Sequence, residues 1–287
     1  MANWSVPLRK SRNRFLILLC LGLIPLTGLA DALPRHSPYP GGIAVIPLVS
    51  ADAVEPKGYF HKRRVMISKN RGKWYAIVGL SLDLKPGQHS IIRIDTQGQR
   101  HRHFFYLQDK KYPAQYITVK KKKWVTPNKK QLDRIIAERK IIIKALTTWS
   151  SNPSPQFQLV KPVQGRYSSA FGLRRFFNKK PRRPHSGIDI AAPTGTAIHA
   201  PAPGIILITG DYYFNGKTIF IDHGQNMVSM LNHLSKIMVT SGMMVKQGDK
   251  IGEVGSTGRV TGPHLHWSLS LNNTRVDPRI FLQEGVR

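Results

Sequence analysis

Short apolar runs separated by turn residues dominate the chain from residue 43 to residue 119. These runs are rich in β-branched and aromatic residues, which favour strands. They occur at residues 43–49, 64–68, 74–82, 90–94, 103–107 and 115–119. Glycine-containing breaks such as Pro86–Gly87 separate several of them. The pattern predicts a small all-β domain over residues 43–127, arranged as a sandwich.

A helical period replaces the strand pattern after Asn128. Apolar residues there recur at three-and-four spacing, namely Leu132, Ile135, Ile136, Ile142, Ile143, Leu146 and Trp149. Asn128 can cap this helix, and Gln131 stands three positions later, as in a capping box. We therefore expect an amphipathic helix over residues 128–149 whose apolar stripe packs on one domain or bridges two. Residues 150–156, rich in Ser and Pro, predict a linker.

The last part of the chain, residues 157–287, returns to short apolar runs divided by turns, and its pattern predicts no long helix. Most of the 24 glycines lie in this part. Glycine permits tight turns and close approaches of the backbone, so their concentration here suggests turns around a groove. Together the patterns predict a mostly β protein with a single connecting helix.

Residues 1–30 have the layout of a secretory signal. The first fourteen residues carry four basic side chains and no acid, and a mostly apolar run from Phe15 to Ala30 follows. This run is short for a membrane span and contains Pro25, so we expect a cleaved signal peptide, with an uncleaved membrane anchor as the alternative. Residues 31–42, rich in Pro and Gly, predict a linker.

The charge of the chain is strongly positive, with 44 Lys and Arg against 15 Asp and Glu, a formal net charge of +29. Such charge attracts polyanions. Export makes nucleic acid a poor partner and an anionic polymer of the cell envelope a good one. Residues 31–159 hold 24 basic and 8 acidic residues, whereas residues 160–287 hold 16 and 7. We therefore expect the excess charge to serve attraction to the envelope, apart from any chemistry in the last domain.

Candidate chemistry is confined to the last domain, which holds six of the eleven histidines. These are His185, His199, His223, His233, His264 and His266. Asp189 stands between two isoleucines and needs a partner, because an unpaired carboxylate among core residues is costly. Two of the histidines are two apart on a predicted strand and would share a face, with their apolar neighbours on the other.

Zinc accepts imidazole and carboxylate ligands, and the single Cys20 excludes a multi-cysteine site. A metal site and a set of structural histidines are therefore the two interpretations of these residues. Spacing alone does not tell which three of them would bind a metal.

Four motifs, in order, resemble the LytM/lysostaphin-type (duplicated hybrid motif) zinc metallopeptidases, which cut peptidoglycan cross-links and stem peptides. They are FGLRRFFNKKPRRPHSGIDIAAPTGT, IDHG, NHLS and GSTGRVTGPHLHW, within residues 160–282. Residues 31–150 also resemble the β-rich N-terminal domain of a Gram-negative branch of this family. The resemblance implies an antiparallel β-sheet metallopeptidase domain with an open groove over residues 157–287.

Carried over by motif, the resemblance implies the zinc ligands His185, Asp189 and His266 and the catalytic histidines His233 and His264. One zinc ion per chain would activate water, with one imidazole as general base and the other stabilising the oxyanion. Which histidine plays which part stays open. The family usually has Tyr two residues before His233, where this chain has Leu231, which puts local groove packing or substrate preference in doubt. Weaker expectations place three residues along the substrate groove, namely His223, Asn178 and Thr261.

The resemblance implies an exported zinc endopeptidase that hydrolyses peptide bonds of peptidoglycan in the periplasm or cell envelope. The alternative is a non-catalytic wall-binding regulator that activates a separate amidase. Expected partners are peptidoglycan and anionic envelope polymers, with association to the inner membrane if the N-terminus stays uncleaved. The bond that is cut, the role of the N-terminal domain and the oligomeric state stay open.

Overall fold

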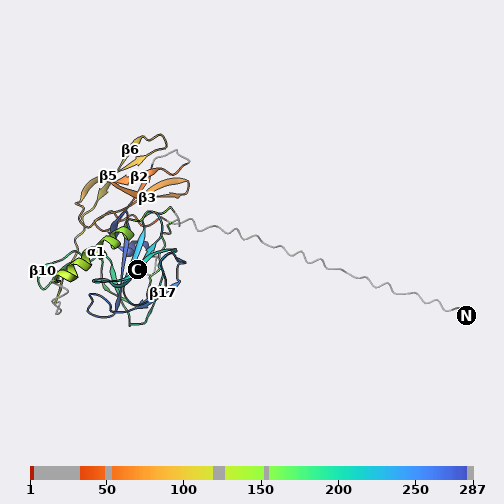
Figure 1. Cartoon of the computed structure of the whole chain (residues 1–287). Helices are drawn as coiled ribbons and strands as arrows, with labels where there is room; N and C mark the ends of the chain where they lie inside the picture. The colour runs from red at the N-terminus through yellow and green to blue at the C-terminus, as the bar shows by residue number, and fades with distance from the viewer. Residues whose placement is uncertain (3–32, 49–53, 119–126, 152–154, 283–287) are drawn as a thin grey trace. The chain divides into compact units, whose positions relative to one another are not determined.

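The computed structural model describes residues 1–2, 33–48, 54–118, 127–151 and 155–282 (Figure 1). Residues 31–287 form one compact unit, and residues 1–30 form another. All but the first two residues of the expected signal or anchor, including Cys20, lie outside the described residues. None of the helices in the described ranges is long and apolar enough to cross a membrane. The mostly β fold class is confirmed.

The N-terminal strands form one antiparallel sheet in the order β1-β4-β3-β2-β5-β6. They are β1 (Ile43–Leu48), β2 (Lys57–Phe60), β3 (Arg63–Asn70), β4 (Lys73–Gly79), β5 (Gly87–Ile94) and β6 (Arg100–Leu107). The first half of β3 pairs with β2 and the second half with β4, and the outer strands β1 and β6 touch. The sheet therefore curls around its own apolar core. Strand β2 has no counterpart among the predicted runs, because it is short and contains Lys and Gly.

Strand β7 (Ala114–Ile117) was expected to end the N-terminal domain, and this assignment is wrong. It pairs in parallel with β9 (Arg174–Phe177), which in turn pairs with β10 (Lys180–Pro181) in a separate three-stranded sheet. The rings of Tyr116 and Phe176 stack across the β7–β9 pair with centroids 4.8 Å apart. Strand propensity predicted an extended segment here, but the pairing partner lies about sixty residues further along the chain.

Helix α1 (Lys129–Leu146) begins with the expected capping box. The Gln131 backbone N–H donates to Asn128 Oδ1 at 2.9 Å, and Gln131 Oε1 accepts from the Asn128 N–H at 3.0 Å. Two of the unpaired N–H groups at the start of the helix are thereby satisfied. The sequence-based start of the helix is confirmed.

The apolar stripe of α1 does not face a core along its length, which corrects the prediction from periodicity. Leu132, Ile136 and Ile143 keep 45%, 56% and 45% of their surface exposed. Only the last turn is buried, where Ala145 and Leu146 join a cluster with residues of β13 (Gly204–Tyr212), β14 (Gly216–Asp222) and β15 (Val228–Ile237). In its middle the helix meets the same part of the sheet through polar groups, since Arg134 donates to the Asp211 carbonyl and Glu138 accepts the Tyr213 N–H. A regular apolar period could not tell which turns have an apolar neighbour.

The C-terminal strands build a large antiparallel sheet whose main path runs β16-β13-β14-β15-β18-β11-β8. The remaining bounds are β8 (Arg166–Ser169), β11 (Ile188–Ala191), β12 (Ala197–His199), β16 (Met244–Val245), β17 (Lys250–Val254), β18 (His264–Leu271) and β19 (Thr274–Val276). Within residues 157–282, the structure has a single short 3₁₀ helix, Pro278–Phe281, and no α-helix. The expected antiparallel sheet domain is confirmed.

Residues 33–42 were expected to be a linker, and they are packed instead. Gly41 accepts the backbone N–H of Asp277 at 2.9 Å, and Pro40 accepts the Tyr112 hydroxyl at 2.7 Å. Gly41 has φ +81°, and a side chain there would collide with Phe171. Pro and Gly here serve a buried turn, which composition alone does not distinguish from a linker.

The register of three central strands sets a polar row beside an apolar row. Asp189 on β11 lies opposite His266 on β18, and His266 lies opposite Asn232 on β15. One residue along, Ile188, Trp267 and Leu231 pair in the same way. Directly paired residues in an antiparallel sheet share a face, and successive residues alternate faces. The polar row (Asp189, His266 and Asn232) therefore lines one face, while the apolar row (Ile188, Trp267 and Leu231) fills the core.

Candidate metal centre

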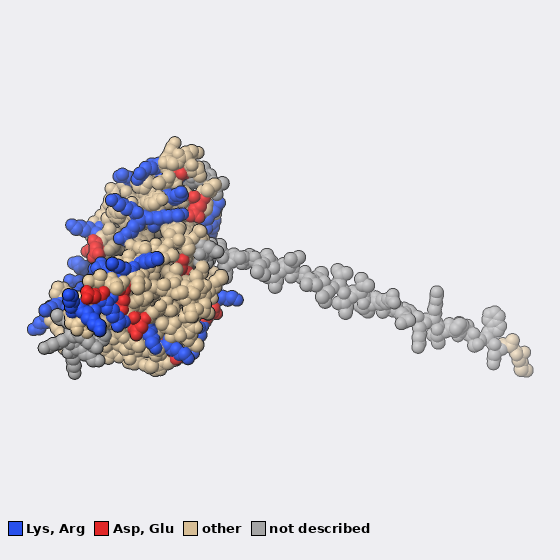
Figure 2. All heavy atoms as spheres, in the orientation of Figure 1, with Lys and Arg blue, Asp and Glu red and all other residues tan. Residues whose placement is uncertain are grey.

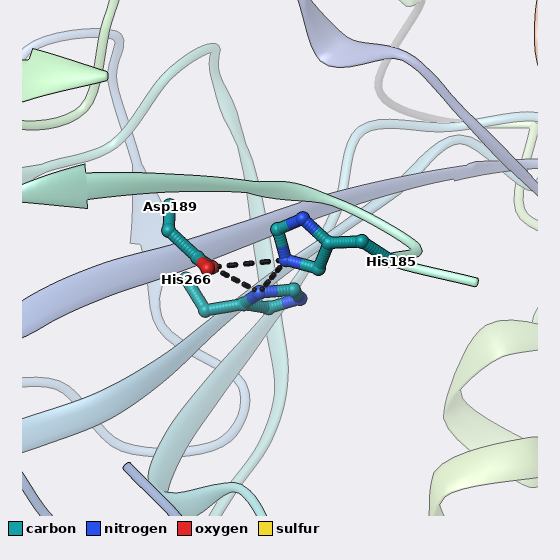
Figure 3. Close-up of side chains that lie close together, drawn as sticks. All are labelled: His185, Asp189 and His266. Carbon is teal, nitrogen blue, oxygen red and sulfur yellow. Dashed lines mark hydrogen bonds and ion pairs between the residues drawn. The ribbon is translucent and has the colours of Figure 1, made fainter. Parts of the chain in front are cut away.

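Three side chains converge at the polar row (Figure 3). Asp189 Oδ1 lies 3.0 Å from His185 Nε2 and 2.8 Å from His266 Nδ1, and the two nitrogens are 3.0 Å apart. These atoms all lie within 4.8 Å of one another, and all three residues are buried. Such a cluster of imidazole and carboxylate donors can hold a metal ion.

Hydrogen bonds on the outer side of each imidazole orient the ring. His185 Nδ1 lies 2.7 Å from the carbonyl oxygen of Ala170, so it carries the proton and donates it there. His266 Nε2 lies 2.9 Å from Ser268 Oγ, and a proton on Nε2 is donated to that oxygen. In this arrangement the inward nitrogens are both lone-pair donors, and with the Asp189 carboxylate they fit a cation.

The charge of Asp189 is also held from outside. Arg175, on β9, donates to Asp189 Oδ2 at 3.0 Å and to Ser169 Oγ at 3.0 Å. Burial by itself would raise the pKa of Asp189. Without a cation, protons on the facing nitrogens of His185 and His266 form hydrogen bonds to the carboxylate, and these outweigh burial and hold that pKa well below its ordinary value. Burial lowers the pKa of His266 to about 4, so its imidazole is neutral at neutral pH and can offer a lone pair.

The two other histidines of the predicted site stand beside this cluster. His264 shares a face of β18 with His266, and its Nε2 lies 3.8 Å from Asp189 Oδ1. The ring of His233 is 5.0 Å from that of His264 and 6.1 Å from that of His266. His233 has φ 71°, a left-handed conformation that interrupts the alternation of β15 and brings its ring to the polar face next to Asn232.

Both of these histidines contact a backbone carbonyl through Nδ1. The distances are 2.9 Å from His233 to Thr257 and 2.9 Å from His264 to Gly262. A proton held on Nδ1 leaves Nε2 as the acceptor. Burial, with the neighbouring rings of His266 and His264, lowers the pKa of His233 to about 3, so this imidazole is neutral near pH 7.

The five residues lie in a groove of about 1060 Å³. Its walls come from β7 and β9, from α1, and from the glycine-rich loop before β18. Five arginines line it, namely Arg139, Arg175, Arg182, Arg183 and Arg259, and among the described lining residues Asp189 is the single acid. Basic side chains are also spread over the face seen in Figure 2. The expectation that positive charge lies apart from the chemistry is therefore wrong for the groove, although the N-terminal part carries more of the total.

Comparisons with known proteins fit this geometry. The profile of peptidase family M23 matches residues 183–278, and that of the peptidase family M23 N-terminal domain matches residues 36–110. A crystal structure of a peptidase M23 from Pseudomonas aeruginosa is 39% identical, with a TM-score of 0.73, over 86% of this chain and 96% of that chain. The chain belongs to peptidase family M23. The resemblance drawn from the four motifs is thereby confirmed.

Curated relatives match part of this chain. Peptidoglycan DD-endopeptidase ShyA of Vibrio cholerae is 40% identical over 113 residues, which is 39% of this chain and 26% of ShyA. DD-carboxypeptidase/endopeptidase Mpg of Neisseria meningitidis serogroup B is 40% identical over 122 residues, which is 42% of this chain and 28% of Mpg. The match thus spans between a quarter and a third of each relative.

Of the three residues expected along the substrate groove, the structure places one in the groove lining and two outside it. Thr261 lines the groove of this M23 chain. His223 does not, because it is 1% exposed and contacts the Pro203 carbonyl at 2.7 Å and Ser229 Oγ at 2.9 Å. Asn178 lies in the β9–β10 turn with φ 49°, outside the groove lining. A histidine and an asparagine in turns offered no sequence signal to separate packing from a site.

Leu231, which replaces the family tyrosine, lies in the apolar row and is fully buried. It does not line the groove, so the departure concerns core packing. Sequence reasoning missed Asn232 and Arg175, although Asn232 alternates with Leu231 on its strand. The signal for Arg175 was absent, because its partner Asp189 is fourteen residues away on another strand.

Proposed function

We propose that this M23 chain is an exported, zinc-dependent endopeptidase that hydrolyses peptide bonds in peptidoglycan stem peptides or cross-links. The observation that carries the proposal is the cluster of His185, Asp189 and His266 beside the imidazoles of His233 and His264, in one groove. The names of the relatives ShyA and Mpg support peptidoglycan as the substrate.

The three converging atoms suit zinc, which takes histidine nitrogen and carboxylate oxygen and, in catalytic sites, keeps a position open beside three protein ligands. When bound, zinc supplies Lewis-acid chemistry that activates water for attack on a peptide carbonyl near neutral pH. Asp189 contributes one negative charge, and its second oxygen is held by Arg175. The ligand set therefore leaves net positive charge at the site.

The chain's own groups supply the proton transfers. His264 and His233 each keep a proton on Nδ1 by donating it to a carbonyl, which leaves Nε2 as a proton acceptor. His264 Nε2 faces the ligand carboxylate at 3.8 Å. One imidazole accepts the proton of the attacking water at Nε2 and returns it to the leaving amine. The other stabilises the oxyanion in the form whose Nε2 also carries a proton, because only an N–H can donate to that oxygen. Mutating either histidine removes one of these two roles.

The rival function is a non-catalytic wall-binding regulator of a separate amidase. The described residues include every ligand and both histidines that the family motifs require, and they converge in space. A regulator has no need of this convergence. The peptidase is therefore the better supported of the two.

Export to the periplasm or cell envelope belongs to the same proposal. Its support is the basic segment followed by an apolar run in residues 1–30. Anionic envelope polymers are proposed as further partners because of the +29 charge, with inner-membrane association if the segment stays uncleaved. Sequencing the N-terminus of the protein recovered from envelope fractions tests this, and recovery in the cytosol alone contradicts it.

Purified sacculi provide the test of the activity. Incubation with the zinc-loaded chain should release peptides with new amino groups, identified by mass spectrometry, and a chelator or His185→Ala should abolish release. His199→Ala is the matched control, because His199 lies in the same domain outside the groove lining. Binding to sacculi without any cleavage would favour the regulator.

A further inference from the structure

The groove carries more positive charge than the metal cluster uses. Arg175 is engaged with Asp189, Ser169 and Gln115. The other four lining arginines come from α1, from the segment after β10 and from the glycine-rich loop. The groove's one described acid, Asp189, is already committed to the cluster.

Arg259 is the most firmly placed of these four. Its guanidinium lies 4.3 Å from the centroid of the Phe214 ring and 5.1 Å from that of Phe177. The backbone N–H of Arg259 donates to the Phe214 carbonyl at 2.9 Å. The backbone N–H of His233 donates to the carbonyl of the next residue, Asn215, also at 2.9 Å. This short backbone connection ties Arg259 to the same part of the groove as the catalytic histidines.

The surroundings of Arg259 favour a negative ligand. Burial, then the charges of Arg175 and Arg182, lower the pKa of Arg259 to about 10, so it stays protonated at neutral pH among like charges. Two aromatic faces hold the planar guanidinium in place, which lowers the entropic cost of a two-point hydrogen bond. Guanidinium groups of this kind bind carboxylates in bidentate geometry.

We propose that Arg259, with Arg182, forms an anion subsite that binds a free carboxylate of the peptide substrate next to the bond that is cut. The inference rests on the proposed peptidase function and names the chemical class of its substrate, a peptide with an ionised carboxyl group beside the scissile amide. A carboxylate held by the two arginines would place the scissile amide beside the metal cluster, because all of these residues line one groove. Amidation of that carboxyl group removes the charge and the bidentate acceptor.

The test uses two disaccharide-peptide dimers with the same cross-link, one with free carboxyl groups beside it and one with carboxamides. The wild-type full chain should cleave the carboxylate dimer with kcat/KM about 10- to 100-fold higher, the range for a hydrogen bond to a charged group. Arg259→Gln should abolish this preference by slowing only the carboxylate dimer, and Arg259→Lys should keep part of it. Arg182→Gln, at an exposed position, should reduce the preference less, and its thermal midpoint should match that of the wild type.

Arg166→Gln is the control, since Arg166 is an exposed arginine of β8 outside the groove lining. Equal rates for the two dimers with wild-type protein overturn the inference, as does an Arg259→Gln variant that slows both dimers equally. Calorimetric titration of each dimer into protein whose metal has been removed by a chelator measures the binding preference for the carboxylate dimer without cleavage. Preferential binding without hydrolysis defeats the peptidase proposal and leaves the subsite standing, whereas hydrolysis without preference does the opposite.

Asn232 supplies a second, independent feature of the groove. It is 3% exposed, it lines the groove, and its Oδ1 has no hydrogen-bond partner among the described residues. It lies directly across the strand pair from the ligand His266. A buried acceptor without a partner is costly, and native proteins keep such groups chiefly where a ligand completes them.

We infer that the Asn232 side-chain amide binds a backbone N–H of the substrate peptide, beside the site where the amide bond is cut. This inference also rests on the peptidase function. The direction in which replacing Asn232 changes stability separates a substrate-binding role from a structural role. An apolar side chain of similar size removes the unsatisfied acceptor without leaving a cavity.

Asn232→Leu should lower kcat/KM for the carboxylate dimer by about 10-fold, while the thermal midpoint and zinc content stay equal or rise. Asn226→Leu is the matched control: Asn226 is 4% exposed, but its Nδ2 donates to the Leu146 and Thr148 carbonyls at 2.8 Å. That change should lower the midpoint. Full activity of Asn232→Leu, or a fall in both its midpoint and its activity, contradicts the inference. Weaker dimer binding to the chelated variant supports it even if no cleavage occurs.

Discussion

The two faces of the central strands differ in kind, because one carries the polar row of the site and the other the apolar row of the core. On one face, the polar row places Asp189 and His266 against each other within 2.8 Å, at the floor of a groove. On the other, the apolar row packs Trp267 and Leu231 at 0% exposure. Adjacent residues of one strand therefore serve different ends. Because β18 lies between β15 and β11, the same backbone hydrogen bonds fix both faces at once.

The difference shows how stability and chemistry are separated in this chain. The apolar row gains free energy by leaving water, roughly in proportion to its area. The polar row gathers groups whose facing atoms are lone pairs and a carboxylate, which is unfavourable without a cation. Changes in the first row should act on unfolding, and changes in the second on metal binding and rate.

Trp267→Ala should give the largest change in stability. Removing a fully buried indole leaves a cavity, and the expected cost is about 3–5 kcal/mol in the free energy of unfolding. Denaturant titration of the metal-free protein measures it. A loss below about 1 kcal/mol would show that the apolar row is not the principal support of the sheet.

His266→Ala, one residue before Trp267 on the same strand, should change activity and metal binding rather than stability. We expect a loss of activity on sacculi of more than about 100-fold, because even the outer hydrogen-bond partners of metal ligands typically contribute 10- to 100-fold. Unfolding of the metal-free variant should shift by about 1 kcal/mol or less. Metal analysis of the purified variant should show the loss of bound zinc. A variant that keeps both its metal and its activity would contradict the assignment of metal binding to the polar row.

Ser268→Ala tests the hydrogen bond behind the ligand. Its Oγ lies 2.9 Å from His266 Nε2, and without it the ring can rotate and change tautomer. Zinc affinity should fall by about 10- to 100-fold, measured by competition with a chromophoric chelator. Ser270→Ala is the matched control, since Ser270 is equally buried two residues further on and its Oγ has no partner among the described residues. Equal effects of the two changes would contradict the orienting role.

Ile136→Gln on helix α1 should have the smallest effect. Its side chain is 56% exposed, so the free energy of unfolding should change by no more than about 0.5 kcal/mol. Leu146→Ala in the buried last turn should cost about 2–5 kcal/mol. Thermal and denaturant unfolding of both variants check the pair. A large loss of unfolding free energy in Ile136→Gln would support the core-facing stripe that the periodicity predicted.

Much of the site could be predicted because its residues lie in local motifs with a period. His264 and His266 alternate with apolar neighbours, and a strand of period two must place them on one face. Asp189 between two isoleucines demanded a partner. Asn232 and Arg259 escaped prediction, because their importance comes from contacts with segments that are distant in the sequence. His223 was placed in the groove because a histidine in a turn looks the same whether it packs or binds.

The amino-acid sequence by itself determined the mostly β class, the capping box of α1, the family and the residues able to bind a metal. These follow from local backbone preference and from motifs a few residues long. The tertiary structure alone decided that β7 joins β9, that most of the α1 stripe is exposed and that residues 33–42 are packed. It also decided that five arginines surround the groove. Each of these depends on which distant segment lies alongside, and burial and charge are properties of that neighbourhood rather than of the residue.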